Sequence, residues 1–257
     1  MNFLCALVLV ASVAVGHCVP INNASPTPDQ IKELTGATIL YFLSALPKTS
    51  SAPLPNFANE RLRIPEIDTN VTVAGKNGMA YGINQVLIDQ YEFDASTSAT
   101  KFRLTSPNFT KVYDIEVEGK IFGHEISGEG VSRQEIVGEG YVVSNLRFEE
   151  INHSLQIASI ELNLLLDNVI LDLEGLTVDG ISIQELEKLM ANYVLNQFNE
   201  AKEEQSKSIA AFMKSQFNKS WAGYSTDEVI QWLRDHTNGS AQMDFVQKYV
   251  NSLSRAL

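Results

Sequence analysis

The feature that most constrains the fold is a regular alternation of apolar and polar side chains between Lys111 and Ile121. Apolar or small residues occupy every second position, namely Tyr113, Ile115, Val117, Gly119 and Ile121. Charged residues stand between them, namely Asp114, Glu116, Glu118 and Lys120. A period of two places each set on its own face of a strand, so the segment predicts a half-buried antiparallel β-strand.

The same alternation recurs along most of the stretch from about 62 to 175. Further strands are predicted at 66–73, 80–93, 99–105, 142–148 and 155–166, the last with a change of parity at 158–159 that predicts a β-bulge. Turns or breaks are predicted at Gly75–Gly78, Asp94–Thr97, Gly123 and Gly128–Gly130. The predicted strands are long, roughly 9–14 residues, and long antiparallel strands twist, so a flat sheet is not expected.

Helical patterns stand on both sides of this strand-rich stretch. Capping boxes that begin at Thr27, Ser182 and Ser225 each predict the start of a helix. The predicted ranges are about 28–46, ended by Pro47; 183–220, either continuous or broken near Ser206; a helix from 226 that ends at Asn238–Gly239; and a last amphipathic segment at about 241–255. Residues 48–60, with two prolines, are predicted to be a loop.

This order of elements predicts an α+β fold with a long antiparallel meander. A curled sheet with one apolar face needs a cover, and the helix over 183–220 is the natural one. Incomplete wrapping would leave an apolar tunnel, whereas complete packing would leave a filled core. Flexible side chains that suit a tunnel lining are Met190, Phe198, Met213 and Phe217. Residues 19–257 are predicted to be a single domain, with 224–257 as a helical C-terminal extension.

The first residues predict a secretory signal peptide over 1–18. Met1–Val15 is apolar and uncharged, and cleavage is expected after Gly16 or after Cys18. A membrane anchor is the alternative, but the apolar run is shorter than the roughly 20 residues that span a bilayer. Cys5 and Cys18 are the two cysteines of the chain. The processed protein is therefore predicted to have no intramolecular disulfide, and the protein is expected to be secreted and extracellular.

Sequons for N-glycosylation support the secreted interpretation. All six Asn-x-Ser/Thr sites are predicted glycosylation sites, and those that lie too close to the fold are expected to be unused. The six are Asn23, Asn70, Asn108, Asn152, Asn218 and Asn238.

Charge and motif content exclude several classes of function. The net charge of −12 disfavours binding to nucleic acid and docking on anionic membranes, and no stable membrane insertion is expected. The chain lacks G-x-S-x-G, H-E-x-x-H and P-loop motifs, and His124, His153 and His236 are scattered singly. No catalytic residue, metal site or cofactor is predicted, and the protein is not expected to be an enzyme. A secreted hydrolase with an unrecognised pair of carboxylates is one alternative.

The apolar volume that remains predicts a carrier of a hydrophobic small molecule or lipid. The candidate ligand-binding residues combine inward strand positions with one stripe of the long helix. They are Tyr113, Ile115, Val117, Ile121, Leu146, Phe148, Leu189, Tyr193, Met213 and Phe217. The alternative is an innate-immune or structural recognition protein with a filled core and no small-molecule cargo.

Three groups of residues carry a family resemblance over about residues 28–222. They are Pro107, Tyr113, Gly119 and Gly128-Glu-Gly130 in the centre; Val73 and Gly82-Ile83-Asn84 upstream; and Leu195–Phe198 with the run to Trp221 downstream. Their order and spacing resemble the insect juvenile-hormone-binding protein/takeout superfamily. The mite group 7 allergens share the same architecture.

The resemblance implies a tubular lipid-binding fold, in which a highly curved antiparallel sheet wraps a long C-terminal helix. It also implies a lipophilic ligand, such as a terpenoid, a fatty acid or another lipid, and no catalysis. The chain departs from the family's pattern in two ways. The processed chain cannot form the usual N-terminal cysteine pair, and 224–257 extends past the expected end. These departures indicate a divergent member.

Overall fold

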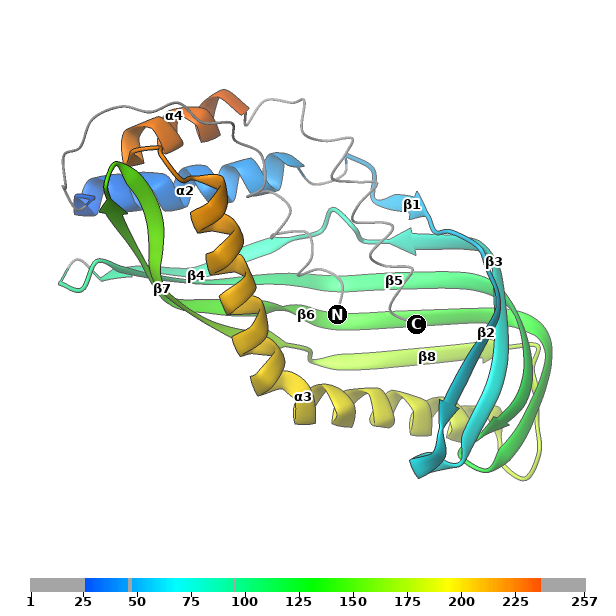
Figure 1. Ribbon diagram of the computed structural model, residues 1–257. Helices are drawn as coiled ribbons and strands as arrows, with labels where there is room; N and C mark the ends of the chain where they lie inside the picture. The colour runs from blue at the N-terminus through cyan, green and yellow to red at the C-terminus, as the bar shows by residue number, and fades with distance from the viewer. Residues whose placement is uncertain (1–25, 46–47, 95, 237–257) are drawn as a thin grey trace.

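The computed structural model describes residues 26–45, 48–94 and 96–236 (Figure 1). Its helices are α2 (Pro28–Ala45), the short 3-10 helix η1 (Pro65–Ile67), α3 (Ile183–Ser220) and α4 (Thr226–His236). Its strands are β1 (Ser51–Pro53), β2 (Phe57–Ile64), β3 (Thr69–Tyr81), β4 (Leu87–Asp94), β5 (Ala99–Ile121), β6 (His124–Ile151), β7 (Ser154–Leu165), β8 (Asn168–Glu174) and β9 (Thr177–Val178). Outside the described residues lie the predicted signal peptide over 1–18, Cys5, Cys18, Asn23, Pro47, Asn238 and the segment 241–255.

Within the described residues, β5 and β6 form the centre of a nine-stranded antiparallel sheet. These two strands are 23 and 28 residues long, and they meet at a turn made by Phe122 and Gly123, both with positive φ. The first half of β5 pairs with β4 and the second half with β3, which also pairs with β1 and β2. The first half of β6 pairs with β9 and β8, and the second half with β7. Each half of the sheet therefore has its own neighbours and curves in its own way.

The structure corrects two of the predicted breaks and joins two of the predicted strands. Gly75–Gly78 lies inside β3 and Gly128–Gly130 lies inside β6, while the strands predicted at 99–105 and 111–121 are one continuous strand. The loop predicted at 48–60 is also wrong in part, because β1 and the first half of β2 fall within it. At Gly130 a Cβ atom would collide with the carbonyl oxygen of Glu174 on β8. Glycine there marks a close approach of two strands rather than the end of one.

Other local predictions are confirmed. Thr27 and Gln30 exchange the two hydrogen bonds of the capping box that opens α2. In the register of β6 and β7, Arg147 pairs with Ser159 and Phe148 with Ile157, so Ala158 is the extra residue of the predicted bulge.

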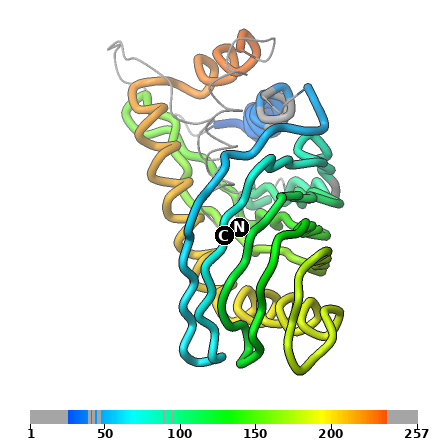
Figure 2. The backbone as a smooth tube through the Cα atoms, turned by 90° about the vertical axis from the view of Figure 1, so that its right-hand side faces the viewer, coloured from blue at the N-terminus to red at the C-terminus, as the bar shows by residue number. Residues whose placement is uncertain are grey.

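The sheet curls around the first half of α3 (Figures 1 and 2). At the right of Figure 1, β2, β3 and the joined ends of β5 and β6 bend down toward this helix, and Figure 2 shows the same strands from that side. The helix itself packs against β7 and β8. The structure thus has the architecture expected from the sequence, with a curved antiparallel sheet around a long C-terminal helix.

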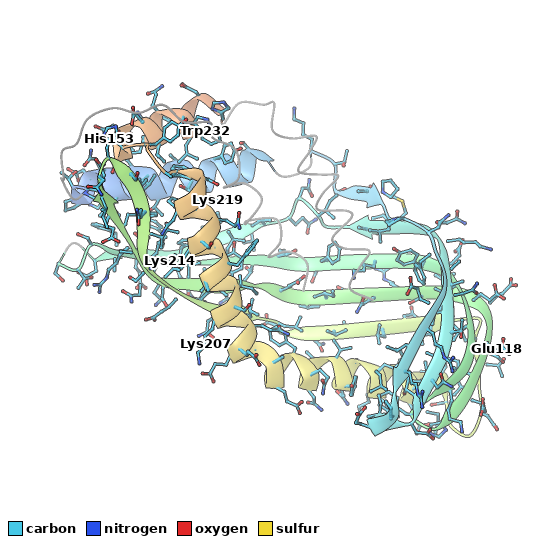
Figure 3. All side chains as sticks on the ribbon, in the orientation of Figure 1. Glu118, His153, Lys207, Lys214, Lys219 and Trp232 are labelled. Carbon is cyan, nitrogen blue, oxygen red and sulfur yellow. The ribbon has the colours of Figure 1, made fainter. Side chains whose placement is uncertain are left out.

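Helix α3 is continuous over 38 residues, so the alternative of a break near Ser206 is wrong. The helix does change direction near Lys207 (Figure 3). The Ser206 hydroxyl donates a hydrogen bond to the Lys202 carbonyl at 2.6 Å and accepts one from the Leu164 amide at 3.2 Å. A serine that bonds back to the preceding turn bends a helix. The bend lets one half of α3 follow the curled end of the sheet while the other half follows β7.

The opposite end of the molecule has a core rich in aromatic side chains. There α2 and α4 pack against each other, with the rings of Tyr41 and Trp232 5.4 Å apart. The Phe217 ring of α3 stacks on Trp221 at 4.7 Å and lies 5.6 Å from Phe148 of β6. These aromatic contacts join the end of α3 to β6, and Trp221, which follows α3, lies 6.1 Å from Trp232 of α4.

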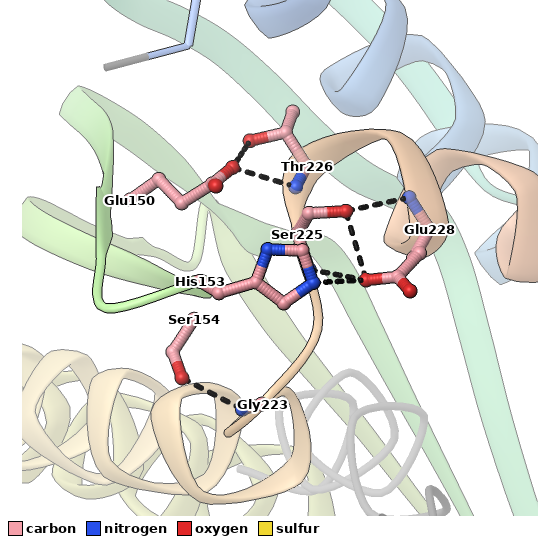
Figure 4. A network of polar contacts seen from close by, with 7 residues as sticks. All are labelled: Glu150, His153, Ser154, Gly223, Ser225, Thr226 and Glu228. Carbon is pink, nitrogen blue, oxygen red and sulfur yellow. Dashed lines mark hydrogen bonds and ion pairs between the residues drawn. The ribbon is translucent and has the colours of Figure 1, made fainter. Parts of the chain in front are cut away.

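Polar groups of the β6–β7 hairpin hold the start of α4 (Figure 4). One carboxylate oxygen of Glu150 accepts hydrogen bonds from the amide and the hydroxyl of Thr226, both at 2.9 Å. The Nε2 atom of His153 lies 3.1 Å from a carboxylate oxygen of Glu228. Glu228 also accepts the amide hydrogen of Ser225 at 2.8 Å, which completes the predicted capping box. The hairpin and the helix start therefore form one hydrogen-bonded unit.

The Glu228 carboxylate makes the stability of this unit depend on pH. The hydrogen bond from the Ser225 amide is the largest cause that lowers the pKa of Glu228 below its ordinary value of 4.5. A lowered pKa in the folded state stabilises the protein above pH 4.5, and the effect disappears as the pH falls through the folded-state pKa. We expect Glu228→Gln to cost about 0.5–1 kcal/mol at pH 7, a small value because the group is partly exposed.

The measurement is urea unfolding of the wild type and the variant between pH 7 and pH 3. The gap between the two proteins should close as the pH falls below about 4. Glu204→Gln, an exposed carboxylate on α3, is the matched control and should change little at any pH. An equal gap at pH 7 and pH 3 would contradict the assignment.

Candidate functional site

A cavity of about 610 Å³ lies between the inner face of the curled sheet and the first half of α3. This volume falls within the roughly 300–1,000 Å³ of typical small-molecule sites. From α3 the lining residues are Met190, Val194, Gln197, Phe198, Ala201 and Gln205. From β2, β3, β5 and the start of β6 they are Phe57, Glu60, Arg61, Leu62, Val71, Val73, Lys111, Tyr113, Ile115, Val117, Ile121 and Ile126. The remainder of β6, the β7–β8 region and the residue after β8 contribute Ser132, Gln134, Ile136, Glu139, Gly140, Leu164, Leu165, Leu166, Val169, Leu171, Leu173 and Leu176.

The mouth of this cavity lies between β2 and α3. Leu62 of β2 and Val194 of α3 line the cavity, and they are 47% and 37% exposed to solvent. Among the described strands, β2 pairs only with β3. Its other edge therefore forms no ladder with the sheet. The rim of the cavity consists of one free strand edge and one helix face.

Four of the ten predicted ligand-binding residues line this cavity. They are Tyr113, Ile115, Val117 and Ile121, all on the inner face of β5. Each is at most 8% exposed. Of the flexible side chains expected in a tunnel, Met190 and Phe198 line the cavity as well.

The other six predicted residues lie outside the cavity lining. Leu146, Phe148 and Phe217 are buried in the aromatic core at the far end of α3, and Met213 packs against that core. The Tyr193 ring packs edge to face on Phe122, at 5.9 Å between ring centroids. Leu189 is 41% exposed to solvent. The structure therefore brings together the strand positions but divides the helix positions between two ends of the molecule.

Charged and polar side chains also line the cavity, and none of them was among the residues predicted from the sequence. Lys111 of β5 and Glu139 of β6 are 5% and 9% exposed. Burial lowers the pKa of Lys111, and the nearby carboxylate of Glu139 opposes this shift. Lys111 and Tyr113 are two residues apart on β5, so their side chains lie on the same face of the strand. This spacing in the sequence indicates that Lys111 points inward. Glu139 gave no such signal, because Gly138 has a φ of 67° and interrupts the alternation of β6.

The described residues offer no alternative site with metal chemistry. No group of three or more His, Cys, Asp or Glu side chains lies close enough to hold a metal ion in this part of the chain. None of the described helices is both long and apolar enough to cross a bilayer.

These features define a protein with a helix in a curled sheet and an apolar cavity between the two. The chain belongs to the family described as haemolymph juvenile hormone binding protein, whose model matches residues 5–231. This match confirms the resemblance to the juvenile-hormone-binding protein/takeout superfamily that was noted in the sequence. The members of this family are binding proteins.

Two solved structures are also similar to this chain. Takeout 1 of Epiphyas postvittana is 13% identical, covers 86% of this chain and 92% of its own, and has a TM-score of 0.35. A lipopolysaccharide binding protein is 11% identical, covers 78% of this chain and 40% of its own, and has a TM-score of 0.31. No protein in the curated set matches the chain.

Proposed function

We propose that this protein is a secreted carrier that binds a lipophilic small molecule in the cavity between β2, β5 and α3. The observation that carries the proposal is the volume of about 610 Å³ enclosed mainly by apolar side chains. Burial of an apolar ligand there is favourable by about 25 cal/mol per Å² of surface removed from water, before the entropy costs of binding. Membership of the family of haemolymph juvenile hormone binding proteins supports the same function.

The cavity also supports this proposal against its two alternatives. A recognition protein with a filled core would not leave several hundred Å³ enclosed, because protein interiors pack densely. A hydrolase would need two carboxylates placed across a substrate. The carboxylates that line the cavity are those of Glu60 and Glu139; Glu60 is exposed at the rim and Glu139 is buried. This division favours a binding site over a catalytic pair.

The test is direct binding to the full chain after processing. The protein is extracted with organic solvent, refolded, and titrated with a fluorescent apolar probe, while native mass spectrometry of unextracted protein searches for a lipid that copurifies. We expect saturable binding of one probe per chain, and displacement of the probe by long-chain lipids. Absence of both probe binding and a copurified lipid from folded protein would overturn the proposal.

Secretion implies that exposed sequons are glycosylated. In the structure the sequon asparagines differ in how far they are exposed to solvent. Asn70, Asn108 and Asn152 are exposed. The side chain of Asn218 is instead half-buried on α3, and its carbonyl oxygen accepts the Ile157 amide of β7 at 2.8 Å. An N-glycan would be attached to the Nδ2 atom of Asn218, which donates to the Ile157 carbonyl oxygen at 3.5 Å, so the sugar would have to fit into the contact between α3 and β7.

We therefore expect Asn218 to be unmodified when the full chain passes through a eukaryotic secretory pathway. Peptide mapping with and without glycosidase should find glycan on at least one of the three exposed sites and none on Asn218. Asn218→Ala should lower stability by about 1 kcal/mol, because the Ile157 amide loses its partner. A glycan on Asn218 in folded, secreted protein would contradict this assignment.

A further inference from the structure

The cavity is apolar along most of its length but polar near its inner end. Lys111, Gln134 and Glu139 come from the two central strands, and Gln205 comes from α3 opposite. Charged side chains are rarely buried unless they meet a partner, because their desolvation is costly. A binding site that needed only to hold hydrocarbon would not require these groups. Their presence indicates that the ligand has a polar part.

The strand register explains how these side chains reach one place. Lys111 pairs with Gln134 across β5 and β6, and both face inward. Further along β6, the positive φ of Gly138 shifts the alternation, so that Glu139 lines the cavity although it lies an odd number of residues from Gln134. A side chain at position 138 would collide with the carboxylate of Asp167. Glycine at this position therefore lets Glu139 line the same cavity as Lys111.

The inner end carries one positive and one negative formal charge. The two groups are close enough for Glu139 to favour the charged form of Lys111 against the effect of burial. The carbonyl oxygen of Gln205 is buried, and among the described residues it has no hydrogen-bond partner. The polar end thus offers an ammonium donor, a carboxylate acceptor and an unused amide acceptor.

We propose that the cavity selects a long-chain lipid with an uncharged hydroxyl head over the corresponding carboxylate, and that Lys111, Glu139 and Gln205 hold this head. This inference rests on the proposed carrier function. A hydroxyl both donates and accepts, so it complements an ammonium and an acceptor at once. A carboxylate only accepts, and it would bring a second negative charge beside Glu139 where water cannot screen it.

The rest of the cavity fits the chain of such a lipid. From Lys111 to Ile121 the strand path is roughly 33 Å, at about 3.3 Å per residue. Ile115, Val117 and Ile121 line this path, and Met190 faces it from α3. The charged residues Glu60 and Arg61 also line the cavity, but they are exposed on β2 and carry opposite charges. Charged groups that stay hydrated at the rim of the cavity contribute little to the difference in affinity between lipids with different polar head groups.

The experiment compares hexadecanol with hexadecanoate as competitors of the fluorescent apolar probe at about pH 8. The wild type should bind the alcohol at least about tenfold more tightly than the acid. Glu139→Gln removes the negative charge and leaves Lys111, so this variant should reverse the preference. Glu116→Gln is the matched control, because Glu116 is exposed on the opposite face of β5, and it should keep the wild-type preference.

A second variant keeps the test decisive if Glu139→Gln does not fold. Gln205→Leu removes the unused acceptor, so it should weaken the alcohol several-fold and leave the acid unchanged. Equal affinities for alcohol and acid in the wild type, or a preference that neither variant alters, would overturn the inference while the carrier function stands. Failure of the folded wild type to bind the probe at all would instead overturn the carrier function itself.

Discussion

Val117→Trp is expected to abolish binding of apolar ligands while the protein remains folded. Val117 is 5% exposed and lies midway along the β5 wall of the cavity. An indole at this position would occupy the space through which a ligand chain must pass. Loss of affinity by a factor of about 100 or more follows if the displaced chain has nowhere else to bind, since each factor of ten is about 1.4 kcal/mol. Probe titration measures this loss.

The neighbouring residue supplies the control for this variant. Glu116→Trp introduces the same side chain into the same strand, but on the exposed face, and it should bind the probe as the wild type does. Overpacking by Val117→Trp is expected to cost about 1–3 kcal/mol of stability, which thermal unfolding will show separately from binding. If folded Val117→Trp binds the probe with wild-type affinity, the cavity between the sheet and α3 is not the binding site.

Phe217→Ala is expected to destabilise the protein strongly while leaving the ligand cavity intact. Phe217 is 8% exposed and packs between Trp221 and Phe148 in the aromatic core at the far end of α3. Truncation of a buried phenylalanine costs about 3–5 kcal/mol, because both transfer energy and packing are lost. For a chain of this size the melting temperature should fall by about 6–20 °C. Calorimetry or circular dichroism on heating measures the change.

Helix α3 also provides the control for this second prediction. Phe212 lies on the same helix and is 50% exposed, so Phe212→Ala should change the free energy of unfolding by no more than about 0.5 kcal/mol. Phe217 was expected from the sequence to contact ligand, but it does not line the cavity. Below its melting temperature Phe217→Ala should therefore bind the probe normally. If Phe217→Ala loses probe binding but keeps the stability of the wild type, Phe217 contributes to ligand binding after all.

The sequence was informative where one local pattern determines which face a residue occupies. The alternation around Tyr113 predicted both the strand and the side that faces the cavity, because a strand has only two faces. The capping boxes predicted where α3 and α4 begin, since the hydrogen bonds involved are local. The parity change near Ala158 predicted a bulge for the same reason.

The sequence was less informative where distant parts of the chain decide the outcome. Leu189 and Val194 belong to one helix, yet both are partly exposed and only Val194 lines the cavity. Five positions along a helix correspond to a rotation of about 140°, so the two side chains lie on different faces of α3, and the curl of the sheet decides which face meets the cavity. Glycines suggested turns at Gly128–Gly130, whereas the structure uses Gly130 to let β8 approach β6. Glu139 escaped notice because one positive φ at Gly138 reverses the parity of a strand.

The single-sided pairing of β2 has a consequence for how cargo could come and go. Strands in the middle of the sheet are held by ladders on both edges, whereas β2 forms a ladder with β3 alone among the described strands, and its Phe57 ring packs on Tyr113 of β5. Displacing β2 breaks one ladder of eight residues at most and leaves the aromatic core at the other end of α3 untouched. Local opening of this kind requires far less free energy than global unfolding. Because β2 borders the cavity while the aromatic core lies at the other end of α3, we expect the rate of ligand exchange to follow the local opening of β2 rather than global unfolding.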